Sequence, residues 1–123
     1  TVSNETMGEP TRIISKETAD TIRGFMESVV SNGTGIYAKP ENMGAGGKTA
    51  STQTGIYDEN GEEIVHAWFA GFFPEETPKY TVVVLKEGGG EGSYIAAPIF
   101  KEIADNLYYY MNPDKIHEQN DGK

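Results

Sequence analysis

The sequence predicts an α/β (α+β) fold in which an antiparallel sheet of about three strands is flanked by an N-terminal and a C-terminal helix. Apolar residues recur at three- and four-residue steps near both ends of the chain, which is typical of amphipathic helices. Between these stretches lie three blocks rich in β-branched and aromatic residues, separated by turn-forming residues. With 123 residues, the chain has the length of one domain.

The first helix is expected to follow a short polar segment, residues 1–11, which we expect to be a flexible arm. Ser15 can cap the start of this helix, because its hydroxyl can accept a hydrogen bond from a free backbone N–H in the first turn. Asn32-Gly33 supplies a stop signal. The apolar stripe of the helix consists of Ala19, Ile22, Phe25, Met26, Val29 and Val30.

Three strand-like blocks follow a glycine-rich loop: Lys48–Tyr57, Glu63–Phe73 and Lys79–Glu87. An Asn-Gly pair at positions 60 and 61 separates the first two blocks and is the strongest short signal for a hairpin. We therefore expect an antiparallel meander. The large aromatic residues of the second block are expected to lie in the core: Trp68, Phe69, Phe72 and Phe73.

A second glycine-rich segment, Gly88–Gly92, is expected to form a flexible loop before the last helix. Pro98 suits the first turn of that helix, where a missing backbone N–H does no harm. Residues 112–123 are expected to be a polar tail, which leaves residues 12–111 as the folded part. The apolar stripe of the last helix consists of Phe100, Ile103, Ala104, Leu107, Tyr110 and Met111.

The second and third strands carry apolar residues on both faces, whereas a sheet with one solvated face alternates polar and apolar residues. Both faces therefore need cover, and the chain offers only two helices. Either one helix covers each face, or one face is covered by something outside this chain. The second arrangement predicts an exposed apolar surface and a tendency to self-associate.

Composition excludes several classes of function. The formal net charge of −9 argues against a nucleic-acid partner and against contact with a membrane surface. The absence of cysteine excludes disulfides, thiolate metal sites and a cysteine nucleophile. His66 and His117 lie far apart, which argues against a histidine-based zinc site. No metal and no cofactor is expected. The longest aliphatic run, Val82–Leu85, is too short to span a membrane.

Residues 46–53, Gly-Gly-Lys-Thr-Ala-Ser-Thr-Gln, form the most informative segment. The sequence Gly47-Lys48-Thr49 matches the end of a phosphate-binding loop, G-x-x-x-x-G-K-[ST]. That motif requires a glycine where this chain has Asn42, a strand before the loop and a helix after it. A nucleotide-binding domain is therefore the least favoured function for this chain.

In its context, this segment resembles the Lys-Thr-Gly strand of penicillin-binding proteins and serine β-lactamases. The resemblance extends over about residues 12–110 and is closest to class B-like transpeptidases. It implies a fragment of the β-lactamase/transpeptidase-like fold. The blocks that carry it, in order, are the helix and Gly-Thr-Gly turn of Ile14–Gly35, the motif strand Lys48–Gln53, the next strands Trp68–Pro74 and Tyr80–Leu85, and the glycine-rich loop and helix of Gly88–Lys101.

The resemblance implies a role for several residues of the motif strand. Lys48 would be a catalytic residue that supplies positive charge and joins the proton network. Thr49 and Ser51, which share one face of a strand, would bind a substrate carboxylate through their hydroxyls, and Gln53 would be a further substrate-binding residue. The backbone N–H of Ser51 would form one arm of the oxyanion hole. The substrate would lie against this strand as an additional strand.

Two features depart from the family pattern. Ala50 stands where the motif has glycine, and neither Ser-x-x-Lys, the nucleophile motif, nor Ser-x-Asn occurs in the chain. The chain therefore resembles the C-terminal part of a transpeptidase domain without its catalytic serine. It is expected to be inactive alone, because it has no activated nucleophile.

The expected parent is a serine D,D-transpeptidase that cross-links peptidoglycan and binds β-lactams. The resemblance places it at the extracytoplasmic face of a bacterial cell membrane, anchored by a segment outside this chain. The implied partners are the peptidoglycan stem peptide, β-lactams and the rest of the transpeptidase domain. The alternative is a non-catalytic interaction module of the same fold.

Overall fold

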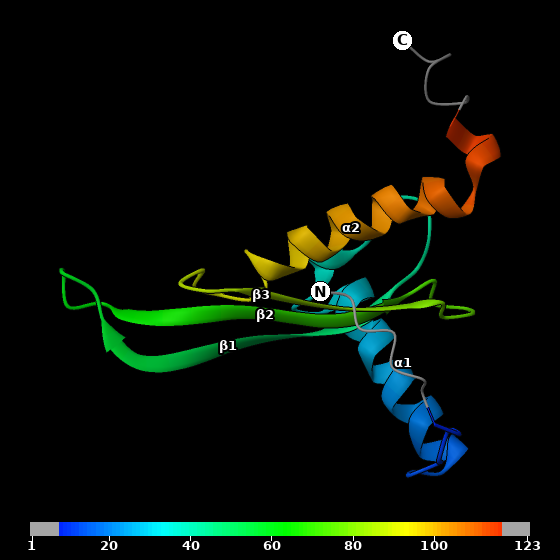
Figure 1. Cartoon of the computed structure of the whole chain (residues 1–123), viewed down its shortest axis with the longest axis horizontal. Coiled ribbons are helices and arrows are strands. Elements are labelled where there is room, and N and C mark those ends of the chain that lie inside the picture. Colours follow the sequence, from blue (N-terminus) through cyan, green and yellow to red (C-terminus); the bar gives the residue numbers. More distant parts are fainter. Residues whose placement is uncertain (1–7, 117–123) are drawn as a thin grey trace.

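The computed structural model describes residues 8–116; residues 1–7 of the expected arm and residues 117–123 of the expected tail lie outside this part. The described residues form a three-stranded antiparallel sheet in the order β1-β2-β3 and two α-helices, which confirms the expected fold class. The helix α2 lies across one face of the sheet (Figure 1). In chain order the elements are α1 (Lys16–Asn32), η1 (Ile36–Ala38), β1 (Gly46–Tyr57), β2 (Glu63–Phe73), β3 (Tyr80–Lys86), α2 (Ala96–Met111) and η2 (Pro113–Ile116).

Both ends of α1 form where the sequence predicts them. The hydroxyl of Ser15 accepts a hydrogen bond from the backbone N–H of Thr18 at 3.1 Å. It thereby satisfies one of the free donors of the first turn. The helix ends at Asn32, and the N–H of Gly33 donates to the carbonyl of Val29 at 3.1 Å.

The central strand, β2, has the bounds that the sequence predicts. Its residues pair on one side with β1, for example Phe69 with Thr49, and on the other side with β3, for example Phe69 with Val84. Partners across an antiparallel pair have their side chains on the same face. Phe69, Val84 and Phe73 therefore belong to one face of the sheet, and all three are buried.

The core lies between this face and α2. The ring of Phe100 on α2 has its centroid 4.7 Å from that of Phe69 and 5.5 Å from that of Phe73. All three rings are fully buried, as is Ala104 one turn further along α2. Burying one phenylalanine side chain contributes about 1.5–3 kcal/mol, so this cluster is a large part of what holds the helix to the sheet.

Within residues 8–116, the opposite face is covered only at one end. There α1 packs near the turn after β2, where the Arg23 guanidinium donates to the carbonyls of Glu75 and Glu76. Farther along this face, Val83 and Leu85 of β3 are 61% and 44% exposed. Of the two arrangements left open by the sequence, the first, one helix covering each face, is not found within residues 8–116: neither helix covers this part of the sheet.

Several apolar residues of the predicted helix stripes and of the predicted core are not fully buried. On α1, Ile22 is 47% and Phe25 68% exposed, because this helix meets the sheet mainly through its C-terminal end, where Val30 is buried. Tyr110 is exposed because the end of α2 rises away from the sheet (Figure 1). Trp68 and Phe72 are only half-buried, because they point to the face that α2 does not cover.

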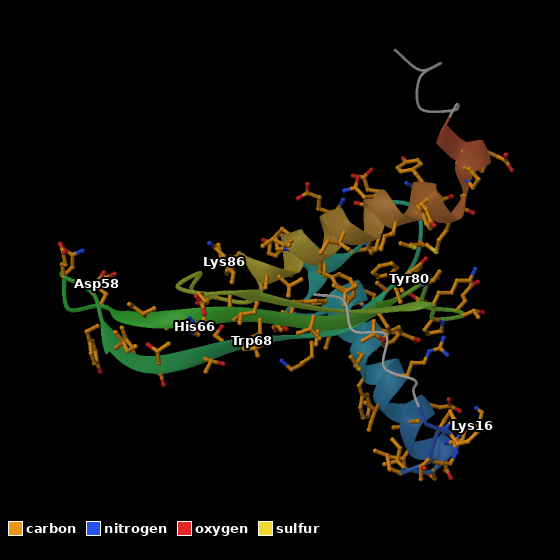
Figure 2. All side chains as sticks on the ribbon, viewed as in Figure 1. Lys16, Asp58, His66, Trp68, Tyr80 and Lys86 are labelled. Carbon is orange, nitrogen blue, oxygen red and sulfur yellow. The ribbon has the colours of Figure 1, made fainter. Side chains whose placement is uncertain are left out.

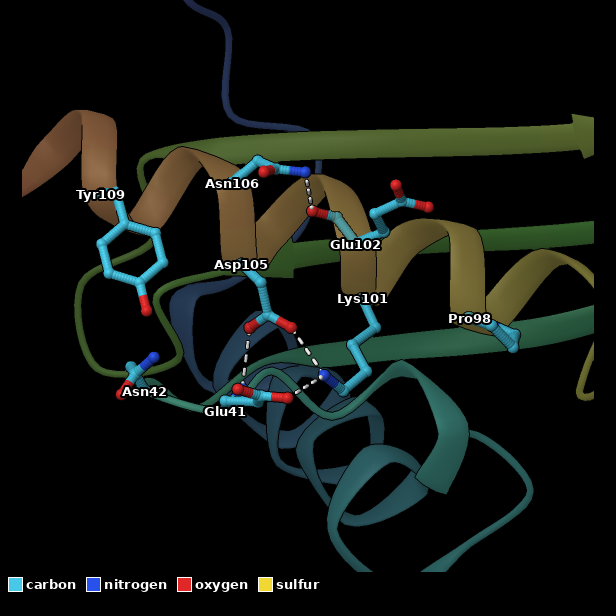
Figure 3. Close-up of a pocket in the computed structure, with 8 residues that line it drawn as sticks. All are labelled: Glu41, Asn42, Pro98, Lys101, Glu102, Asp105, Asn106 and Tyr109. Atoms are coloured by element: carbon cyan, nitrogen blue, oxygen red, sulfur yellow. Dashed lines mark hydrogen bonds and ion pairs between the residues drawn. The ribbon is translucent and has the colours of Figure 1, made fainter. Parts of the chain in front are cut away.

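A polar network ties the segment before β1 to the outer side of α2. The Lys101 ammonium bridges Glu41 at 3.1 Å and Asp105 at 2.6 Å, and the backbone N–H of Glu41 donates to Asp105 at 2.8 Å (Figure 3). These groups line a pocket of about 440 Å³. The hydrogen bonds to Asp105 and Glu41 raise the pKa of Lys101 above its usual range. The network fixes the chain just before β1 begins.

We expect Lys101→Met to lower the free energy of unfolding by about 1 kcal/mol at pH 8, since it removes two partly exposed ion pairs. The pKa of Lys101 is higher in the folded than in the unfolded chain, where it is about 10.4. The contribution of Lys101 to the free energy of unfolding is therefore complete below pH 10. It is lost as the pH rises through the pKa of Lys101 in the folded chain. Urea unfolding of both chains at pH 8 and pH 11 measures it.

Lys16→Met is the matched control, because Lys16 also pairs with a carboxylate four residues away, Asp20, but on a largely exposed part of α1. It should change the unfolding midpoint little at either pH. Equal stability of Lys101→Met and the unchanged chain at pH 8 would show that the network does not hold the segment.

Candidate functional site

The residues singled out in the sequence lie along β1, which is an edge strand of the sheet that residues 8–116 form. Lys48, Ser51 and Gln53 are exposed there, and Thr49 is half-buried. Each keeps a regular partner on β2, so this part of the strand is an extended, unbroken edge. The pairing becomes irregular only beyond Gln53. An edge of this kind can accept a further strand.

The backbone of this edge presents the N–H of Ser51 outward. The carbonyl oxygens of Ala50 and Trp68 both lie next to Gly92, and so they converge. A Cβ atom at Gly92 would overlap both of these oxygens and would lie 3.0 Å from the backbone N of Ala50. This convergence indicates that Ala50 and Trp68 form a hydrogen-bonded pair, with the backbone polar groups of Ala50 facing β2. Polar groups alternate along a strand, so those of Thr49 and Ser51 face away from β2.

The carbonyl of Thr49 supports this orientation, because the Lys48 ammonium donates to it at 2.6 Å. Thr49 and Ser51 pair with Phe69 and Ala67 and so belong to the face that carries α2. Lys48 and Ala50 belong to the opposite face, but the ammonium group folds back to the edge. The edge thus offers the Lys48 ammonium and the outward backbone N–H of Ser51, with the hydroxyl of Thr49 beside them.

The loop Gly88–Gly92 is tied down at three points, whereas the sequence suggests a flexible segment. Gly88 N donates to His66 Nδ1 at 3.1 Å, Gly90 N to the carbonyl of Val65 at 3.0 Å, and Gly92 N to the Ser51 hydroxyl at 3.1 Å. Gly92 has to be glycine because its backbone lies directly on the sheet. The Ser51 hydroxyl oxygen is therefore engaged as an acceptor, and its proton remains available to a ligand.

A second neighbour of the strand is Thr34, whose hydroxyl oxygen lies 3.2 Å from that of Thr49. Sequence reasoning noticed the glycines on either side of Thr34 but assigned no role to the hydroxyl between them. It also assigned no role to the N–H of Gly92. A polar residue between two glycines, and a glycine run that follows an edge strand, are the signals that could have drawn attention to them.

Gln53 lies at the far end of this edge, and its side chain is engaged elsewhere. The Gln53 amide donates to Glu63 at 2.9 Å, and the same carboxylate accepts the N–H of Gly55 at 2.8 Å. Both contacts are made across the start of the β1–β2 hairpin. A ligand on the edge would meet the Gln53 amide only if it replaced Glu63.

The structure also bears on the other functions considered. Lys48 and Thr49 lie inside a strand that leads into a hairpin, whereas a phosphate-binding loop precedes a helix. Within residues 8–116 no three His, Cys, Asp or Glu side chains are grouped so that they could hold a metal ion. None of the helices in this part is long and apolar enough to cross a membrane.

Comparison with known proteins gives a consistent result. Residues 4–105 match the family model described as the penicillin binding protein transpeptidase domain. The chain is 34% identical over 130 residues to penicillin-binding protein PbpB of Mycolicibacterium smegmatis, covering 91% of this chain and 19% of that protein. It is 37% identical over 99 residues to stage V sporulation protein D of Bacillus subtilis, covering 75% and 15%.

A solved structure agrees with these relatives. The transpeptidase domain of FtsI4 D,D-transpeptidase from Legionella pneumophila superposes with a TM-score of 0.64 at 31% identity. The match covers 77% of this chain and 37% of that domain. The chain thus spans less than a fifth of the two curated relatives and about a third of the solved domain. It belongs to the family of penicillin-binding protein transpeptidase domains and corresponds to a fragment of such a domain.

Proposed function

We propose that this chain is the part of a serine D,D-transpeptidase that holds the substrate carboxylate, within a longer parent that cross-links peptidoglycan and reacts with β-lactams. The observation that carries the proposal is the free edge of β1, where the outward N–H of Ser51 lies beside the hydroxyl of Thr49 and the ammonium of Lys48. Residues 12–111 then form a partial transpeptidase domain. Relatives named peptidoglycan D,D-transpeptidase support the same activity.

Each group of the edge has a chemical task in this proposal. A stem peptide lies along β1 as a further strand. Its terminal carboxylate accepts one hydrogen bond from the Thr49 hydroxyl and another from the Ser51 hydroxyl. Lys48 supplies the positive charge that this anion requires. The Ser51 N–H donates to the oxyanion that forms when the peptide or β-lactam carbonyl is attacked. Farther along, the ligand replaces Glu63 as the partner of the Gln53 amide.

The attacking serine has to come from outside this chain. The uncovered face of the sheet supports this part of the proposal, because its apolar side chains Val83 and Leu85 stay exposed. Figure 2 shows Trp68 on the side of the sheet away from α2. Its indole N–H is buried without a hydrogen-bond partner in residues 8–116. We propose that the rest of the transpeptidase domain covers this face and brings the nucleophile to Lys48.

The proposed location is the extracytoplasmic face of a bacterial cell membrane, where peptidoglycan is assembled, with the anchor in another part of the parent. One observation favours a second candidate, a non-catalytic interaction module. The methyl group of Ala50 is exposed on the same face as Lys48. It therefore stands where a nucleophile that shares a proton with Lys48 has to approach.

In the parent, Lys48→Ala and Thr49→Val should each lower the rate of acylation by benzylpenicillin about 10²-fold or more, because each removes a partner of the carboxylate or of the reacting centre. Thr49→Ser keeps the hydroxyl and should retain most of the rate. The measurement is the rate of adduct formation by intact mass.

Rates within about threefold of the unchanged parent for both Lys48→Ala and Thr49→Val would place the reaction elsewhere. A folded parent that forms no adduct at all would favour the interaction module.

The isolated chain should self-associate through its uncovered face. An exposed apolar patch of several hundred Å² usually finds a partner, and the net charge of −9 opposes association by repulsion that salt screens. The apparent mass in light scattering should therefore rise with protein concentration, and more steeply at 150 mM than at 10 mM salt. Val83→Lys should suppress this rise.

Tyr110→Lys is the control, because Tyr110 is even more exposed than Val83 but lies at the far end of α2. It should leave association unchanged. A strict monomer at both salt concentrations would show that the uncovered face needs no partner.

A further inference from the structure

We propose that Thr34 is a positioning residue for the carboxylate site: its hydroxyl donates to Thr49 Oγ1 and thereby turns the Thr49 proton toward a bound carboxylate. This inference rests on the proposed function of the β1 edge. The two hydroxyl oxygens lie 3.2 Å apart, and the two residues are 15 positions apart in the chain. Thr34 itself need not touch the substrate.

The turn that carries Thr34 is closely constrained. Gly33 N and Gly35 N both donate to the carbonyl of Val29, at 3.1 and 3.0 Å, and so close the end of α1. A Cβ at Gly33 would lie 2.9 Å from Val29 Cα, and one at Gly35 would lie 2.9 Å from Val29 Cγ1 and 3.4 Å from the buried ring of Phe69. Both flanking positions are thus pressed against α1 and the core, and neither has room for a side chain.

The segment after the turn is anchored as well. Gly35 O accepts the N–H of Ala38 at 2.8 Å, and Ala38 is fully buried. Thr34 is therefore the exposed residue between two fixed points, and its side chain meets β1 at Thr49. A turn of this construction holds one hydroxyl at a set place beside the strand.

The chemistry of hydroxyl groups gives the direction of the hydrogen bond. Each hydroxyl has one proton and two acceptor lone pairs, so in the free protein either Thr34 or Thr49 can be the donor. A bound carboxylate can only accept, so the Thr49 proton has to go to it. Thr49 Oγ1 is then left to accept from Thr34. The resulting chain, Thr34 to Thr49 to carboxylate, is charge-assisted, and each bond strengthens the next.

The experiment uses the parent and two probes that differ only at the carboxylate: benzylpenicillin and its methyl ester. Thr34→Val keeps the shape of the side chain but removes the donor. It should slow acylation by benzylpenicillin about three- to tenfold, the effect of losing one hydrogen bond. It should change acylation by the ester by less than twofold. Thr34→Ser restores the donor and should restore the rate with benzylpenicillin.

Thr21→Val is the matched control, because within residues 8–116 the Thr21 hydroxyl bonds only inside α1, to the carbonyl of Glu17. It should leave both rates unchanged. Equal losses with the two probes in Thr34→Val would mean that Thr34 only supports the fold, and would overturn the inference. So would a Thr34→Ser rate as low as that of Thr34→Val.

Lys48→Ala, measured beside these variants, separates this inference from the function on which it rests. If Lys48→Ala is severely impaired with benzylpenicillin while Thr34→Val matches the unchanged parent, the carboxylate site stands and the role of Thr34 is wrong. If Lys48→Ala also matches the unchanged parent, the proposed site itself is wrong.

Discussion

The packing of Phe100 between Phe69 and Phe73 is the interaction on which the rest of the structure depends. It joins the last helix to the central strand, and all three rings are fully buried. Truncating one buried phenylalanine typically costs about 3–5 kcal/mol, against a total stability of about 5–15 kcal/mol for a small domain. Because α2 is held in this place, the loop before it is drawn across the sheet, and Gly92 comes to lie on Ala50 and Trp68.

The same packing makes the two faces of the sheet unequal. One face is sealed by α2, whereas α1 reaches the other only near the turn after β2, so that Val83 and Leu85 stay exposed. The candidate site lies at the edge between the two faces. Thr49 and Ser51 are supported from the sealed side by Thr34 and Gly92, and Lys48 belongs to the open side. This asymmetry agrees with the proposal that the nucleophile arrives from the open side.

The sequence was a good guide wherever the signal is local. The cap at Ser15, the end of α1 and the bounds of β2 follow from residues near one another in the chain, and the structure has them as expected. Burial depends on which elements meet, so the apolar periodicity that placed Ile22 and Tyr110 on helix stripes could not tell that both side chains stay exposed within residues 8–116. The contacts of Ser51 with Gly92 and of Thr49 with Thr34 join distant segments, so the glycine patterns can draw attention to Thr34 and Gly92 but cannot say which residue each will contact.

The central claim is that the β1 edge faces outward at Ser51, ready to pair with a ligand strand. Hydrogen exchange of individual backbone amides, followed by NMR on the isolated chain, tests it directly. The account predicts that the amide of Ala50, which faces β2, is strongly protected, whereas the amides of Thr49 and Ser51 exchange much faster. A Ser51 amide as protected as that of Ala50 would contradict the account, because the N–H proposed for the oxyanion would then be occupied within the sheet.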